Sequence, residues 1–137
     1  MKRKLPRFVI FHHDLFLAVF RPRGILNDKI VSPIIAWLDA EEDQAGKAFN
    51  RFTDLSKLDA VDLNLDKIFR FSLHRRAIYK RDPVKSAFYV TSPATARVVR
   101  WHVLLTDRSP LKVKMFNELA VAAKWLGVSE EELELEV

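Results

Sequence analysis

The chain has 137 residues, a length typical of one domain, and can bury about two-thirds of its unfolded surface without metals or cross-links. Apolar residues make up 49% and charged residues 30%, a balance typical of globular rather than disordered proteins. Cys is absent, which excludes disulfides, thiol catalysis and thiolate metal sites and suits a reducing compartment. We therefore predict a single domain over 1–137, with peripheral tails at 1–5 and 129–137.

The N-terminal apolar run from Phe8 to Phe11 is interrupted at His12, so it is too short for a signal-peptide core or a membrane span. We expect a cytoplasmic, soluble protein. The formal net charge of +5 and the pI near 9.6 permit contact with nucleic acid or anionic lipid. Charge on this scale serves solubility more often than recognition, so nucleic acid is not a favoured partner.

In chain order, the first elements are two β-prone runs over 7–12 and 15–21, which predict a hairpin. Pro22 and Gly24 end its second strand. A helix is expected next, and its apolar positions have helical spacing: Ile30, Val31, Ile34, Ile35 and Leu38. Its start is open between residues 27 and 32, because several residues there can serve as N-cap and Pro33 is best tolerated in the first turn.

An alternating run from Ala48 to Thr53 predicts the third strand, and a turn-prone segment then leads to a helix over about 64–81. Open α/β sheets bind ligands at the carboxyl ends of their strands, so this segment is the part of the chain that most resembles a site. Polar residues in the strand, Asn50 and Arg51 among them, favour a modestly covered or edge-rich sheet.

The pattern of strand and helix then repeats twice. Lys85 to Thr91 predicts a strand, and Ser92 with Pro93 predicts the start of a helix. The inward positions of that helix are expected to be Val98, Trp101, His102 and Leu105. After a strand over 111–115, the expected features are an N-cap at Asn117, inward Leu119, Ala120, Ala123 and Leu126, a C-cap at Gly127, and a capping box from Ser129 to Glu132.

A hairpin followed by three helix-separated strands predicts an α/β fold, because crossovers of a dozen or more residues favour parallel neighbours. We expect a single-layer mixed, mostly parallel sheet of about five strands with four helices.

The residues from Phe52 to Asp62 resemble the strand and loop of the STAS, or anti-anti-sigma-factor-like, superfamily, in which an Asp-Leu-Ser strand end leads to an Asp-Ser-Ser turn at the next helix start. The end of the last predicted helix, from Ala123 to Gly127, is similar to that of the SpoIIAA-like branch of bacterial proteins, many of them uncharacterised. The resemblance implies the STAS fold and a regulatory, protein-binding role.

In the classical members a Ser at that helix start is phosphorylated by a kinase that is also a partner. Counting from Asp54, Asp62 falls on the family's Asp, while Leu63 and Asn64 fall on its two Ser positions. The resemblance thus implies a member without the phosphorylatable Ser. Asn64 is interpreted as an N-cap, whose amide oxygen accepts from a free backbone N–H of the helix.

Candidate reactive groups have simpler interpretations. The carboxylates of Asp54, Asp59 and Asp62 are groups that can bind a cation or act as acid and base. Asp is also common in turns and at helix caps, and we favour this structural role for all three. The His12 and His13 pair is best explained as a hairpin turn, since consecutive side chains of a strand point to opposite faces. We expect no metal and no cofactor.

Motifs of familiar enzymes are missing. There is no Gly-x-Ser-x-Gly, and three Gly residues are too few for a phosphate loop or a dinucleotide fingerprint. His74 and His102 lie in predicted helices without zinc-type spacing, and we interpret them as surface or packing residues. Arg76 falls on the inward face of its predicted helix and would need a partner.

The leading hypothesis is a non-enzymatic regulatory module that binds a protein partner, with a homodimer left open. Its predicted partner-binding residues are Asp54, Ser56, Asp59, Asp62, Asn64, Lys67, Arg70, His74 and Arg75. One alternative is a carrier of a small apolar ligand in a cavity lined by Phe8, Phe11, Phe16, Phe20, Phe49, Phe52, Phe69, Phe71 and Phe88. Another is an unrecognised enzyme using Asp54, Asp62 or His74.

Overall fold

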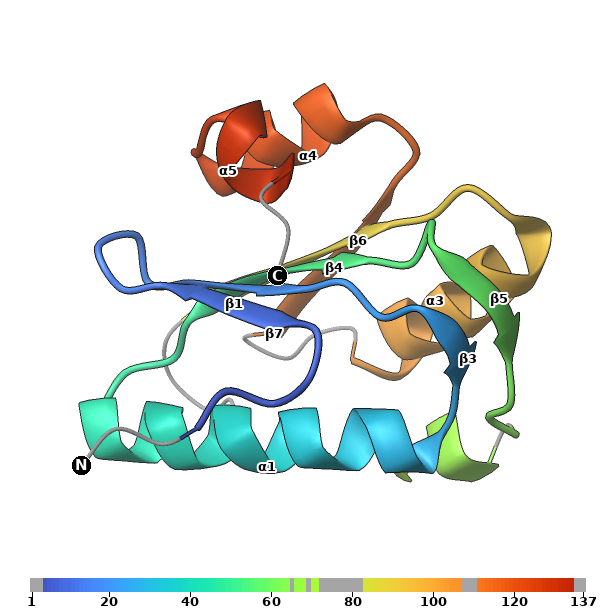
Figure 1. Ribbon diagram of the computed structural model, residues 1–137. Helices are drawn as coiled ribbons and strands as arrows, with labels where there is room; N and C mark the ends of the chain where they lie inside the picture. The colour runs from blue at the N-terminus through green and yellow to red at the C-terminus, as the bar shows by residue number, and fades with distance from the viewer. Residues whose placement is uncertain (1–3, 65, 69, 72–82, 107–110, 135–137) are drawn as a thin grey trace.

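The computed structural model describes residues 4–64, 66–68, 70–71, 83–106 and 111–134. In this part of the chain a five-stranded sheet lies between helices on both of its faces (Figure 1). Residues 66–68 and 70–71 are also helical. The other elements are β1 (Val9–His12), β2 (Leu17–Phe20), β3 (Gly24–Leu26), α1 (Asp28–Ala45), β4 (Asn50–Asp54), β5 (Leu58–Val61), β6 (Val84–Tyr89), α3 (Pro93–Leu105), β7 (Leu111–Phe116), α4 (Leu119–Leu126) and α5 (Glu130–Glu134).

The order of the sheet is β1-β2-β4-β6-β7. β1 and β2 pair antiparallel as a hairpin, and β2, β4, β6 and β7 run parallel. The prediction of a mixed, mostly parallel five-stranded sheet that opens with a hairpin is therefore confirmed.

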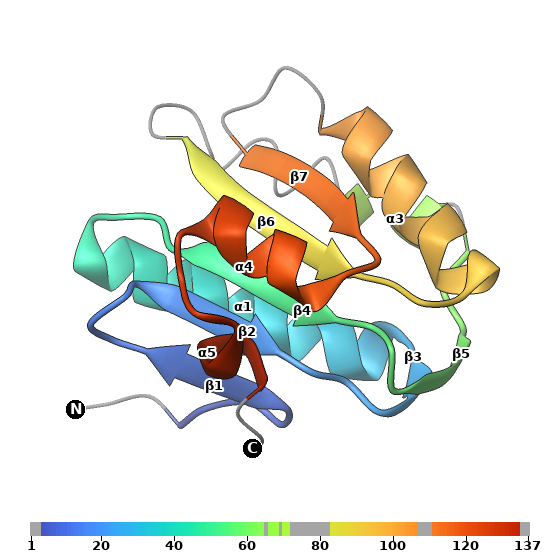
Figure 2. The same ribbon diagram turned by 90° about the horizontal axis from the view of Figure 1, so that it is seen from above.

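The helices divide between the two faces of the sheet (Figures 1 and 2). α4 and α5 cover one face, where Val19, Phe52 and Leu133 belong to a single buried cluster. α1 and α3 lie on the other face, where the buried residues form three separate clusters, around Phe49, Val99 and Val84. The side chains of each strand alternate between these faces, as the two-residue period of a strand requires.

The polar residues of the third strand led us to expect a modestly covered or edge-rich sheet, and for that strand the expectation is wrong. β4 is the central strand of the sheet, and its residues Arg51 to Asp54 are all buried. Polar residues are tolerated there because Arg51 forms an ion pair with Glu42 of α1 and Asp54 forms one with Arg21.

The first helix begins at the earliest of the positions that the sequence left open. The side chain of Asn27 accepts a hydrogen bond from the backbone N–H of Ile30 at 3.2 Å, so Asn27 is the N-cap. Pro33 consequently lies inside α1 rather than at its first position.

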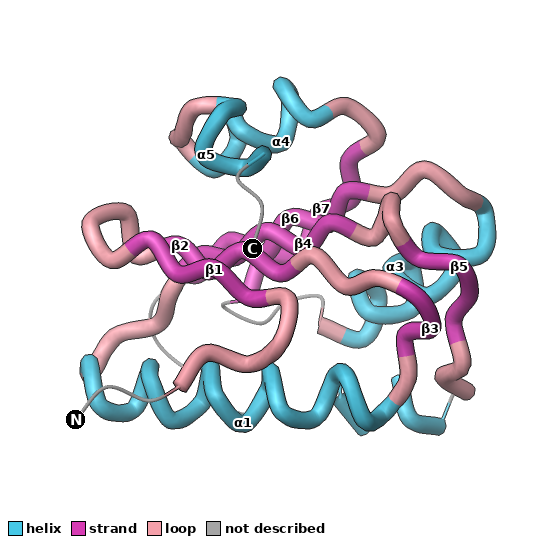
Figure 3. The backbone as a smooth tube through the Cα atoms, in the orientation of Figure 1, coloured by secondary structure: helices cyan, strands magenta, loops and turns pink. Residues whose placement is uncertain are grey.

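A second, two-stranded sheet was not expected from the sequence. β5 lies in the segment that we interpreted as a turn, and it pairs in parallel with β3, which follows the predicted stop at Pro22 (Figure 3). The backbone N–H of Asp62 extends the pairing by donating to the carbonyl of Leu26 at 2.8 Å. Both strands are short and neither alternates regularly, so no local pattern marks them.

Towards the C-terminus, several of the predicted helix caps are confirmed and other predictions are wrong. Ser92 caps α3, Gly127 ends α4 with a φ of 75°, and Ser129 and Glu132 form the expected capping box. The cap predicted at Asn117 is wrong, because α4 follows Glu118, which makes no side-chain cap hydrogen bond. Of the segment 129–137, expected as a peripheral tail, the described residues 129–134 include the fully buried Leu133, which packs in the cluster on the sheet.

Two inward positions were assigned incorrectly. On α4, Ala122 is buried and Ala120 is exposed. On α3, Val99 is buried while Trp101 is 38% exposed. In both helices the buried stripe lies one or two residues from the predicted one, because each helix docks at an angle that its sequence does not specify.

Candidate functional site

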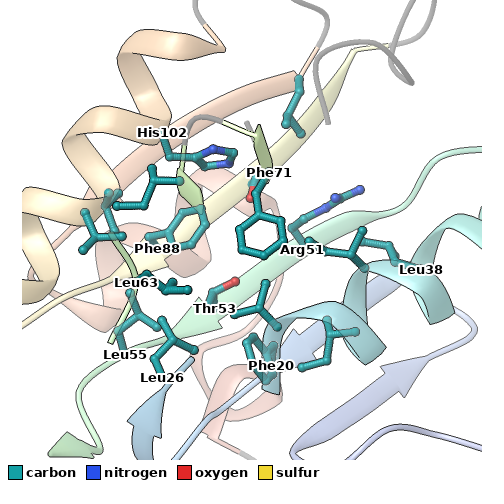
Figure 4. Close-up of a pocket in the computed structure, with 18 residues that line it drawn as sticks. Phe20, Leu26, Leu38, Arg51, Thr53, Leu55, Leu63, Phe71, Phe88 and His102 are labelled. Carbon is teal, nitrogen blue, oxygen red and sulfur yellow. The ribbon is translucent and has the colours of Figure 1, made fainter. Parts of the chain in front are cut away.

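A cavity of about 170 Å³ lies between the sheet and the helices α1 and α3 (Figure 4). The helical residues 68 and 71 form another of its walls. The described residues that line it are Phe20, Leu26, Val31, Ile34, Ile35, Leu38, Arg51, Thr53, Leu55, Leu63, Ile68, Phe71, Ser86, Phe88, Val98, Val99, His102 and Leu111. Most of these side chains are aliphatic or aromatic, which is typical of sites for small apolar ligands.

The position of the cavity follows from the division of the buried core on this face of the sheet into separate clusters. Leu38 belongs to the cluster packed on α1, whereas Leu55 and Val99 belong to the cluster packed on α3. All three line the cavity, as does Leu111 of the third cluster, so the cavity lies where the clusters meet. On the opposite face, the buried residues form one continuous cluster.

The sheet wall of the cavity is polar where β4 meets β6. Arg51 pairs with Ser86 in the register of the two strands, and Thr53 lies two residues further along β4 on the same face. Ser86 is 1% exposed and Thr53 8% exposed, so both hydroxyl groups lie inside the protein.

The guanidinium of Arg51 is held by a buried carboxylate. Its Nη2 donates to Glu42 Oε2 at 3.0 Å and to the carbonyl oxygen of Phe49 at 3.1 Å. The same Glu42 oxygen accepts from the backbone N–H of Phe49 at 2.7 Å. This network joins the end of α1 to the start of β4 and balances the charge of Arg51 at the cavity wall.

His102 contributes an imidazole from α3. Its ring contacts the edge of Phe88 with the ring centroids 5.6 Å apart, and both residues line the cavity. The prediction that His102 is a packing residue agrees with this contact.

Asp54 and Ser56, the first two predicted partner-binding residues, form a closed local arrangement. Asp54 is 4% exposed, and its Oδ1 accepts from the backbone N–H of Ser56 at 2.9 Å and from the Ser56 hydroxyl at 2.6 Å. Its other oxygen lies 3.7 Å from Arg21 Nη1. Asp54 thus shapes the bend after β4, as the turn interpretation expects.

The next predicted residues lie on an exposed surface. Asp59, Asp62 and Asn64 are exposed along and after β5. Asn64 Oδ1 accepts from the backbone N–H of Lys67 at 2.9 Å, so the predicted N-cap is confirmed.

The predicted basic residues of the following helix are paired where they are described. Lys67 Nζ lies 3.0 Å from Asp28 Oδ2 of α1, and Arg70 Nε lies 3.5 Å from Asp66 Oδ2. His74, Arg75 and Arg76 lie outside the described residues, as does Phe69.

Neither acid nor imidazole groups assemble into a reactive centre in the described parts of the chain. No group of three His, Asp or Glu side chains there could hold a metal ion. Asp54 is buried in its ion pair whereas Asp62 is exposed, and His12 Nε2 lies 3.2 Å from the carbonyl oxygen of Glu132. In those same ranges, every helix is too short or too polar to traverse a lipid bilayer.

Sequence reasoning found only part of the cavity. Phe20, Phe71 and Phe88 were among the aromatic residues proposed for it, whereas Phe49 and Phe52 pack in the core clusters. The polar wall was missed, although two strands with polar residues at alternate buried positions were a usable signal.

Comparisons with known proteins leave the function open. No family model and no curated protein matches the chain. Among solved structures, it is similar to an uncharacterised protein of the DUF3478 family with a SpoIIAA-like fold from Shewanella loihica PV-4, with a TM-score of 0.54 and 18% sequence identity over 92% of this chain and 98% of that one. At this identity the similarity concerns the fold alone, and it agrees with the resemblance of the Phe52 to Asp62 segment. The chain has a SpoIIAA-like fold.

Proposed function

We propose that this protein is a non-enzymatic binding module that holds a small, mainly apolar molecule in the cavity beneath β4 and β6. The observation that carries the proposal is the cavity itself, at about 170 Å³ and with a mainly apolar lining. An engineered apolar cavity of about 150 Å³ binds benzene, so a volume of this size accepts a molecule of about one ring.

The location of the cavity supports the same function. Leu55 and Leu63 from the segment after β4 line it, so this segment borders a cavity rather than a flat surface. Open α/β sheets bind ligands at this end of their strands. The lining also comes from α1, α3 and five strands, and sites built on such elements are more precise than sites built on loops.

Fluorobenzene, followed by ¹⁹F NMR, tests this function. We expect saturable binding to the wild-type protein, and loss of binding in Val99→Phe, because Val99 is 1% exposed and lines the cavity. Leu104→Phe is the matched control, since Leu104 is 64% exposed on the same helix and should bind as the wild type does. Wild-type protein that shows no saturable binding, or a Val99→Phe variant that folds and binds normally, would contradict the proposal.

The second candidate function is protein binding on the exposed surface around β5. Asp59, Asp62, Asn64 and Arg70 are exposed there, and Ile25 of the adjacent β3 is 51% exposed. An apolar residue surrounded by charged ones is common at protein interfaces. This surface includes four of the nine predicted partner-binding residues, and a homodimer is one form that it could support.

Charge reversal at this surface distinguishes the second function from the first. In a cross-linking pull-down, Arg70→Glu should lose a partner or a dimer that Lys29→Glu, an exposed change on α1, retains. An unchanged set of partners with Arg70→Glu, also in combination with Arg75→Glu, would count against this surface.

A further inference from the structure

We infer that the cavity selects a neutral molecule of about one ring that carries a hydroxyl group, a phenol-type compound, over both a plain hydrocarbon and a carboxylate. This inference rests on the proposed function, since it names the ligand class of the same site. It is carried by the two buried hydroxyl groups on the sheet wall and by the charge balance at Arg51.

The hydroxyl groups of Thr53 and Ser86 form a polar strip in the mainly apolar lining, which also includes Arg51 and His102. The strand register places Arg51 beside Ser86 and Thr53 beside Phe88, so the two hydroxyl-bearing residues are diagonal neighbours on one face of the sheet. A ligand oxygen over the boundary between β4 and β6 faces both of them. Figure 4 shows Thr53 among the side chains that surround the cavity.

A ligand that covers a hydroxyl group without forming a hydrogen bond to it removes that group from water, which costs free energy. A ligand hydroxyl can both donate and accept a hydrogen bond, as the hydroxyl groups of Ser and Thr also can. A phenol therefore satisfies the polar strip, whereas a hydrocarbon leaves it desolvated.

The charge of the site argues against an anionic ligand. Of the described residues that line the cavity, Arg51 is the one with a permanent charge, and Glu42 Oε2 lies 3.0 Å from its Nη2. A carboxylate ligand would lose its hydration and meet an arginine that a protein carboxylate already balances. A neutral ligand avoids this loss.

The shape and lining fit an aromatic ring. Phe20 and Phe88 come from β2 and β6 of the sheet and Phe71 from the helical residues 70–71, and all three line the cavity (Figure 4). Aromatic rings prefer offset or edge-to-face contacts with one another, which such an arrangement offers to a single ring.

Three fluorinated ligands of similar size test the inference in the wild-type protein. By ¹⁹F NMR titration, 4-fluorophenol should bind about three- to tenfold more tightly than fluorobenzene, as one hydrogen bond predicts. The carboxylate 4-fluorobenzoate should bind more weakly than fluorobenzene. Equal affinity for the phenol and the hydrocarbon, or tightest binding of the carboxylate, would overturn the inference while leaving the proposed function intact.

Two variants test whether the preference for 4-fluorophenol comes from the polar strip. Thr53→Val and Ser86→Ala should each weaken 4-fluorophenol binding about three- to tenfold and leave fluorobenzene binding unchanged. Thr91→Val is the matched control, because Thr91 is exposed and does not line the cavity. If either strip variant fails to fold, the other one and the wild-type comparison still decide. Failure of all three ligands to bind would instead overturn the proposed function.

Discussion

Removing the Glu42 carboxylate should destabilise the protein more than any single substitution of a residue on the protein surface. Glu42 is 7% exposed, and its Oε2 accepts from both the guanidinium of Arg51 and the backbone N–H of Phe49. Removing one member of a buried ion pair leaves the other charge without its main partner, which costs about 3–5 kcal/mol. We therefore expect Glu42→Ala to lower the free energy of unfolding by that amount.

The melting temperature should fall accordingly. Unfolding entropy is about 2.1 cal/mol/K per residue, so for a chain of 137 residues each kcal/mol corresponds to about 3.5 °C. Glu42→Ala should thus lower Tm by about 10–17 °C in differential scanning calorimetry. Glu42→Gln should cost less, because its amide oxygen can still accept from the N–H of Phe49.

A double variant separates the charge effect from a simple packing defect. Replacing both partners, as in Glu42→Met with Arg51→Met, should recover much of the stability that Glu42→Ala loses, because apolar residues of similar size often replace a buried pair without cost. The reasoning is refuted if Glu42→Ala changes the free energy of unfolding by less than about 1 kcal/mol, or if Arg51→Met added to Glu42→Met makes the protein less stable still.

Three further predictions use urea denaturation. Asn64→Ala should cost about 1 kcal/mol, because it removes the cap on the N–H of Lys67, and Asn64→Asp should restore most of it; equal stability of the two variants would contradict the cap. Asp54→Ala should cost about 2–4 kcal/mol and Ser56→Ala less than about 1 kcal/mol, since the buried carboxylate has three partners and the hydroxyl has one; the reverse order would show that the bend does not depend on Asp54. Phe52→Ala should cost about 3–5 kcal/mol, because Phe52 is fully buried in the cluster under α4; a loss of less than about 1 kcal/mol would place it outside a packed core.

Local signals in the sequence predicted the elements whose stabilising contacts lie within a few residues. The caps at Asn64 and Ser92 were identified because each accepts from an N–H three residues further on, inside the same segment. Gly127 was identified because a left-handed residue at a helix end favours glycine.

Signals that depend on distant partners were missed or misread. The pairing of β3 with β5 joins Leu26 to Val61, and neither strand has an alternating pattern of its own. The cap expected at Asn117 failed for a related reason, since the start of α4 is set by its packing on the sheet rather than by a side-chain hydrogen bond.

By itself, the sequence determined the α/β order, the opening hairpin and the mostly parallel sheet, because hydrophobic period and capping act over short distances. The resemblance to SpoIIAA-like proteins rested instead on the short motifs from Phe52 to Asp62 and from Ala123 to Gly127. Only the tertiary structure decided that Arg51 lies beside Glu42 and that Thr53 and Ser86 face a common cavity. A cavity is volume left where strands and helices from distant parts of the chain fail to fill the space between them, so no single segment encodes it.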